Sequence, residues 1–97
     1  MYNNTLNFIN GQINYHTDPG HGWLEVPMAV LKELEIYDMI TYFSYKKDGM
    51  AYLEEDCDMG LFLKTVKRLF DKDCRQLDIN VINTNDSSVI RNYRRFK

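Results

Sequence analysis

The sequence predicts a single α+β domain over residues 1–97, in which an antiparallel sheet of five or six strands, built from hairpins, carries two helices on one face. Two observations predict this fold class. Short runs alternate apolar and polar residues with glycine-containing turns between them, and two other segments repeat apolar residues at helical spacing. A chain of 97 residues can bury only one hydrophobic core, so a second domain is not expected.

The first predicted hairpin spans residues 5–16 and turns at Asn10-Gly11. Asn and Gly both tolerate the positive φ of a type I′ turn, and alternating runs flank them on either side. We therefore expect Leu6 and Phe8 to face the core from the first strand.

The second predicted hairpin joins residues 40–45 to residues 50–53, with Asp48-Gly49 in its turn. Further strands are expected at residues 23–26 and 77–82. The segment 88–97 is interpreted as either a last edge strand or a loose basic tail.

Two helices follow from the apolar spacing. The first should begin at Pro27, whose fixed φ suits a first helical residue, and end near Glu35. The second follows the acidic run 54–58, where Asp56 or Asp58 would serve as N-cap. The buried stripes of the two helices are expected to be Val30, Leu31 and Leu34, and Met59, Phe62, Leu63, Val66, Leu69 and Phe70.

Charge and composition limit the kinds of partner that we expect for this protein. A net charge of −2 provides no field to hold a nucleic-acid backbone, so nucleic acid is not an expected partner. No segment has the apolar length to cross a bilayer, and the first residues lack a signal-peptide pattern, so we expect a cytoplasmic protein with no membrane partner. Cys57 and Cys74 are expected to stay reduced, because a helix would hold them too far apart for a disulfide.

Two distinctive stretches carry a resemblance: His21-Gly22-Trp23-Leu24-Glu25-Val26-Pro27, and Tyr52-Leu53-Glu54-Glu55-Asp56-Cys57-Asp58. With the helix and strand between them, they resemble a family of small uncharacterised proteins encoded by bacteriophages and mobile elements. The likeness covers roughly residues 18–62. It departs from the family pattern at Phe43, where a tyrosine would be expected. The resemblance implies a phage or plasmid origin, with host-cell cytoplasm as the location, and implies no chemistry.

The same two stretches hold the candidate ligand-binding residues. His16 ends one predicted strand, His21 precedes the next and Glu54 ends a third, so these groups would converge if the three strands are neighbours. Aromatic surface for stacking a ring would come from Trp23, although an ordinary core position is an equally good interpretation. The full candidate set is His16, Asp18, His21, Trp23, Tyr45, Tyr52, Glu54 and Asp56.

Simpler interpretations stand beside this site. His16, Asp18 and His21 could bind a metal ion, but Asp18 capping the backbone of a turn explains the same pattern. No cofactor and no catalytic residue are assigned. The carboxylates beside Cys57 should raise the pKa of its thiol and make it a poor nucleophile. The start of a helix at the same place should lower that pKa.

The sequence thus predicts a small binding protein, non-enzymatic, that sequesters a small ligand such as a nucleotide signal to counter host defence. The alternatives are a protein–protein inhibitor or adaptor of a host factor and a metal-dependent hydrolase. Self-association is expected as well, because aromatic residues on an uncovered sheet face, or a free last strand, would favour a homo-oligomer.

Overall fold

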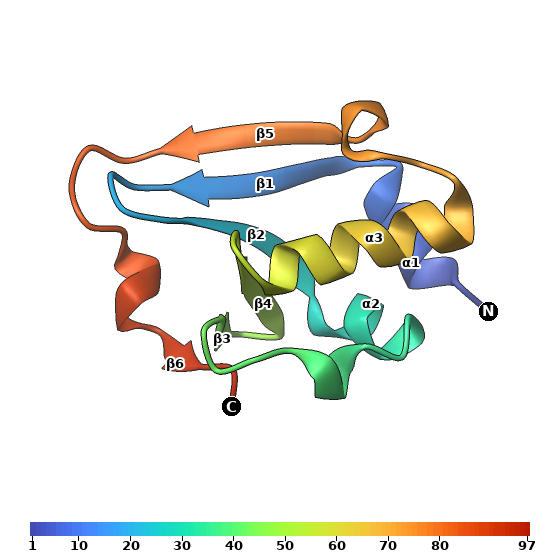
Figure 1. Ribbon diagram of the computed structural model, residues 1–97, viewed down its shortest axis with the longest axis horizontal. Helices are drawn as coiled ribbons and strands as arrows, with labels where there is room; N and C mark the ends of the chain where they lie inside the picture. The colour runs from blue at the N-terminus through green and yellow to red at the C-terminus, as the bar shows by residue number, and fades with distance from the viewer.

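All of residues 1–97 are described by the structure, a computed structural model, in which six strands form one sheet in the order β5-β1-β2-β4-β3-β6 (Figure 1). The strands are β1 (Gln12–Thr17), β2 (Gly22–Pro27), β3 (Tyr45–Lys47), β4 (Met50–Glu54), β5 (Asp78–Asn83) and β6 (Arg94–Arg95). The helices are α1 (Asn3–Ile9), α2 (Met28–Glu33) and α3 (Asp58–Phe70), with short 3₁₀ turns η1 (Tyr37–Met39), η2 (Cys74–Gln76) and η3 (Val89–Asn92).

The α+β class and the six-stranded sheet are confirmed, with two differences. First, β5 pairs with β1 in parallel, whereas every other pair is antiparallel. Second, three α-helices are present where two were predicted. No helix is long and apolar enough to cross a membrane.

The predicted N-terminal hairpin is wrong in its first strand and its turn, because residues 3–9 form α1 and Asn10 ends it, whereas its second strand is confirmed as β1. Thr5 and Ile9, four residues apart, are the buried positions, while Leu6 is 42% exposed. The carboxylate of Glu33 on α2 accepts hydrogen bonds from the backbone of Asn4 and Thr5 at 3.0 and 2.9 Å. These bonds satisfy free N–H groups at the start of α1, so a distant side chain caps the helix.

The second hairpin is confirmed at its turn. Asp48 and Gly49 have φ values of 51° and 81°, as a two-residue type I′ loop requires, and they join β3 to β4. Strand β3 is shorter than predicted, since residues 40–44 lie outside any strand. Pro27 is likewise a correction: it is the extended last residue of β2, and α2 begins after it.

Helix α3 confirms the long amphipathic helix, but its predicted cap is wrong. Cys57 occupies the N-cap position and makes no side-chain cap. The carboxylate of Asp58 instead accepts hydrogen bonds from the backbone N–H of Thr41 at 3.1 Å, from the Thr41 hydroxyl at 2.8 Å and from the Ser44 hydroxyl. Asp58 is 1% exposed, so this carboxylate is a buried anchor for the segment that leads into β3.

The helices pack on one face of the sheet and the last ten residues cover part of the other. The helix side is lined by residues such as Leu24, Leu53 and Phe62. On the opposite face Trp23, Tyr45 and Tyr52 form a second core with Ile90 of η3, which is 2% exposed. We call residues 88–97 the C-terminal cover.

The C-terminal cover ends in the edge strand β6, paired with β3 (Figure 1). This corrects two expectations. Of the two interpretations of residues 88–97, the edge strand is confirmed and the loose tail is wrong. Trp23, Tyr45 and Tyr52 on the second face are not left uncovered, so they give no reason to expect self-association.

Candidate functional site

Strand order brings the predicted polar groups to one region. Strands β1, β2 and β4 are adjacent, which is the condition on which the convergence of the candidate residues depended. His16 lies opposite Trp23, and Trp23 lies opposite Glu54. Because directly opposed residues share a face of the sheet, the three side chains form a row on the face that carries the C-terminal cover.

Asp18 holds the loop between β1 and β2 to the C-terminal cover. Its carboxylate accepts bonds from the backbone of Gly20 and His21 at 3.0 and 2.9 Å and from the backbone of Ser88 at 2.8 Å. The guanidinium of Arg91 adds two more, Nε to Oδ2 at 2.7 Å and Nη2 to Oδ1 at 2.9 Å. The guanidinium, followed by the backbone N–H groups, holds the pKa of Asp18 far below its usual range.

Five donors fill the acceptor sites of one carboxylate, so Asp18 has none left for a ligand. The simpler interpretation, a turn-capping aspartate, describes it correctly. The turn interpretation did not predict its partner Arg91, which is 73 residues further along the chain.

His16 is also committed to other side chains. Its Nε2 lies 2.7 Å from Glu25 Oε1, and its ring packs edge-on against Tyr52 at 5.8 Å between centroids. Tyr52 in turn contacts the ring of Tyr93 on the C-terminal cover at 5.2 Å. The set His16, Asp18 and His21 is therefore not assembled as a metal site.

A pocket of about 280 Å³ lies on this face of the sheet. Four of its residues belong to the candidate set, and three were missed. The lining is His21, Trp23, Tyr45 and Glu54 from that set, together with Phe43, Arg91 and Arg95. The cluster of basic residues in the segment 91–97 could have indicated an anion-binding role for the two arginines. Nothing in the local sequence indicated that this segment folds back onto Trp23.

Each of the two arginines that line this pocket lies over an aromatic ring. Arg95 lies over the ring of Tyr45 at 4.7 Å, and Arg91 lies over Trp23 at 5.4 Å. Trp23 is 2% exposed, and its indole N–H is the one buried side-chain polar group without a hydrogen-bond partner. Trp23 is thus a core residue that also lines the pocket.

Glu54 forms the acidic side of the pocket. Its backbone N–H donates to the hydroxyl of Ser44 at 3.0 Å, and its Oε2 accepts from the backbone of Asp56 at 2.9 Å. Its Oε1 accepts no hydrogen bond and lies 3.8 Å from Nδ1 of His21. Burial raises the pKa of Glu54 above its ordinary value.

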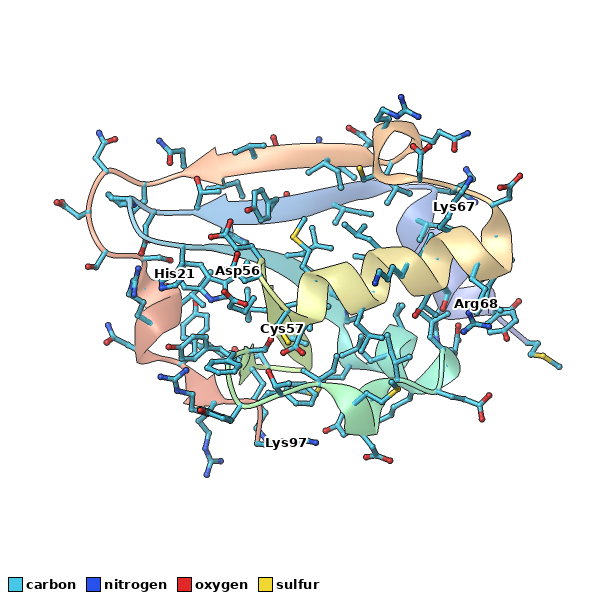
Figure 2. All side chains as sticks on the ribbon, viewed as in Figure 1. His21, Asp56, Cys57, Lys67, Arg68 and Lys97 are labelled. Atoms are coloured by element: carbon cyan, nitrogen blue, oxygen red, sulfur yellow. The ribbon has the colours of Figure 1, made fainter.

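His21 and Asp56 lie beside each other at the rim, between the β1–β2 loop and the start of α3 (Figure 2). Ligand atoms of His21, Glu54 and Asp56 all lie within 4.8 Å of one another. The two distinctive stretches of the sequence therefore meet in space at these three residues.

Tyr15 on β1 holds the acidic segment 54–58 against the sheet through a hydrogen bond to Glu55. Its hydroxyl donates to Glu55 Oε2 at 2.9 Å, and its ring crosses Gly22 so closely that a Cβ there would lie 2.2 Å from the hydroxyl oxygen. The backbone of Glu55 also donates to the carbonyl of Gly22 at 3.0 Å. A side chain at Gly22 would displace Tyr15, so glycine at this position allows both bonds to Glu55 to form.

Cys57, next to this site, is exposed and free. Its pKa is raised, first by desolvation and then by the neighbouring Asp58 carboxylate. A raised pKa keeps the sulfur protonated and disfavours its use as a nucleophile.

Comparison with models of known protein families, with curated proteins and with solved structures finds no match to this chain.

The tyrosines predict an alkaline limit of stability. The pKa of Tyr15 is raised to about 12 by burial and by its bond to Glu55, and that of Tyr52 to about 12 by burial and by Glu25. A tyrosine that ionises at about pH 10 when unfolded stabilises the fold fully below that pH and loses this effect as pH rises toward 12. Melting temperatures measured between these limits should fall, and Tyr52→Phe should make the fall shallower.

Tyr42→Phe is the matched control, since Tyr42 is 57% exposed. It should melt like the wild type throughout. If the melting temperature of the double variant Tyr15→Phe, Tyr52→Phe falls with pH as steeply as that of the wild type, these two tyrosines are not the cause of the alkaline destabilisation.

Proposed function

We propose that the protein is a non-enzymatic binding protein that sequesters a small anionic ligand with a planar ring, of the nucleotide class, in the pocket beside Trp23. The observation that carries the proposal is the combination in one pocket of aromatic walls with two guanidinium groups. Planar rings bind by stacking on aromatic side chains, and phosphates bind to arginine. The resemblance to phage and mobile-element proteins adds the proposal that the ligand is a signal of host defence.

The size of the pocket limits the ligand. Small-molecule sites usually measure about 300–1,000 Å³, and this pocket measures about 280 Å³. It would enclose one base or one phosphorylated sugar, with the rest of the ligand outside. A mononucleotide fits this description better than a large dinucleotide held in full.

Arg95 is the residue best placed to bind the anion. Its guanidinium lines the pocket and makes one long hydrogen bond, from Nη1 to the carbonyl of Tyr42 at 3.3 Å. It has no carboxylate partner, whereas Arg91 is paired with Asp18. A phosphate at Arg95 would therefore gain a charge-assisted contact without breaking an ion pair.

Isothermal titration calorimetry with a panel of mononucleotides, and with inorganic phosphate, tests the proposal. At least one nucleotide should bind, and Arg95→Ala should weaken its binding about tenfold or more, as the loss of one charge-assisted contact implies. Arg94→Ala is the matched control: Arg94 is the adjacent residue of β6, lies opposite Lys46 and does not line the pocket.

Equal loss in both arginine variants would point to general charge attraction and contradict the pocket. Absence of binding by every nucleotide would contradict the ligand class.

One observation favours a second candidate, a protein–protein inhibitor. Strand β5 is a free edge of the sheet, and its Val81 and Ile82 are 60% and 40% exposed. Exposed edge strands pair readily with other chains. Under this alternative a charge placed at Val81 would abolish function while nucleotides would have no effect on the protein.

A further inference from the structure

We infer that His21, Glu54 and Asp56 form a binding site for a divalent transition-metal ion at the rim of the pocket. The three residues offer one imidazole nitrogen and two carboxylates, with ligand atoms all within 4.8 Å of one another. A metal held at about 2.0–2.2 Å from each ligand atom draws such atoms to within about 4.4 Å of each other, so small side-chain rotations suffice.

The hydrogen bonds of the acidic run show which of its carboxylates are available. Glu55 is bonded to Tyr15, and Asp58 is bonded to Thr41 and Ser44. Glu54 Oε1 and the carboxylate of Asp56 accept no hydrogen bond. Of the four carboxylates in residues 54–58, the two that accept no hydrogen bond from another side chain are the two that lie beside His21.

Glu54 gives an independent reason to expect a cation. The residue is 8% exposed, and its Oε1 lies 3.8 Å from Nδ1 of His21, which is beyond hydrogen-bonding distance. A largely buried carboxylate whose oxygen has no hydrogen-bond donor favours a counter-ion. A metal ion at this position supplies the missing positive charge.

The backbone holds the ligand-bearing segments together. The backbone N–H of Asp18 donates to the carbonyl of His21 at 2.9 Å, and that of Glu55 donates to the carbonyl of Gly22 at 3.0 Å. The loop and the acidic run are therefore joined next to the three ligands. Such a frame lowers the entropy lost on metal binding.

The ligand types select the metal. Imidazole nitrogen with carboxylate oxygen suits Zn²⁺, Co²⁺, Fe²⁺ or Mn²⁺, whereas Mg²⁺ favours an all-oxygen shell with several waters. Three protein ligands leave at least one coordination position for a ligand in the adjoining pocket. The metal would also turn the acidic wall of the pocket into one that attracts anions, which goes beyond the proposed function and does not depend on it.

Fluorescence of the single tryptophan provides the test. The rings of His21 and Trp23 lie 6.0 Å apart at their centroids, so a bound Co²⁺ should quench Trp23. Titration of the nucleotide-free protein with Co²⁺ should give saturable quenching with one ion per chain. Zn²⁺ should reverse it by competition, and Mg²⁺ at the same concentration should not.

Three variants decide the assignment. His21→Ala and Asp56→Asn, both at exposed positions, should each weaken Co²⁺ binding about tenfold or more, as loss of one ligand from a weak three-ligand site implies. His16→Ala removes the other histidine, paired with Glu25, and should leave Co²⁺ binding unchanged. Unsaturable quenching, or equal loss in His16→Ala and His21→Ala, would overturn the site, whatever nucleotides do.

Discussion

Asp18→Asn is expected to lower the melting temperature by about 10 °C. The variant keeps the shape of the side chain but leaves the guanidinium of Arg91 without its charge partner, over the ring of Trp23. It also weakens three backbone contacts that hold the loop and Ser88. The C-terminal cover should loosen from the sheet, and Trp23 fluorescence should shift to longer wavelength as water reaches the indole.

The pH dependence of this effect has a definite sign. Because the pKa of Asp18 is depressed in the folded state, its contribution is present above about pH 4, the ordinary value for an unfolded aspartate, and is lost as pH falls below it. The difference in melting temperature between wild type and variant should therefore shrink in acid. Asp86→Asn, an identical change at an exposed position between β5 and η3, is the control and should change little. Equal melting of the two variants would contradict the role given to Asp18.

Asp58→Ala is expected to lower the free energy of unfolding by about 2–4 kcal/mol, because three donors lose their common acceptor. The Ser44 hydroxyl would lose an acceptor while still accepting from the backbone of Glu54. The positions of Tyr45 and Glu54 depend on this network, so nucleotide binding should weaken along with stability. Urea unfolding measures the first effect, and calorimetry measures the second.

The neighbouring Asp56→Ala is the control for stability and should stay within about 0.5 kcal/mol of the wild type, as exposed substitutions usually do. A double-mutant cycle between Asp58→Ala and Thr41→Val should show strong non-additivity, because both changes remove the same bonds. Additive effects would mean that the Asp58–Thr41 contact contributes little.

The elements that sequence reasoning identified are those whose signal is local. Asp48-Gly49 specifies its own turn through two positive φ values, and the stripe that contains Phe62 and Val66 specifies a helix face. The Asn10-Gly11 signal failed although it is just as strong locally. Glu33, almost thirty residues away, stabilises the competing helix, and no pattern within residues 3–16 carries that information.

The candidate site divides in the same way. The pocket is lined by four residues that strand alternation and turn positions indicated to lie together on the sheet: His21, Trp23, Tyr45 and Glu54. Arg91 and Arg95 reach it only because the chain returns across the sheet after β5. That return depends on the ion pair between Arg91 and the buried carboxylate of Asp18 and on Ile90 packing against aromatic rings, both of which are contacts between segments far apart in the sequence.

Both outermost strands of the sheet come from residues 78–97: β5 closes one margin and β6 the other. The four inner strands come from residues 12–54 and pair antiparallel in one continuous run. A chain emerging from the ribosome can thus assemble the inner run early, but the outer sides of β1 and β3 stay unpaired until residues 78–97 have been made. Until then two unpaired margins stay open to other chains, so truncation or early termination near the end should produce aggregates rather than a smaller folded protein.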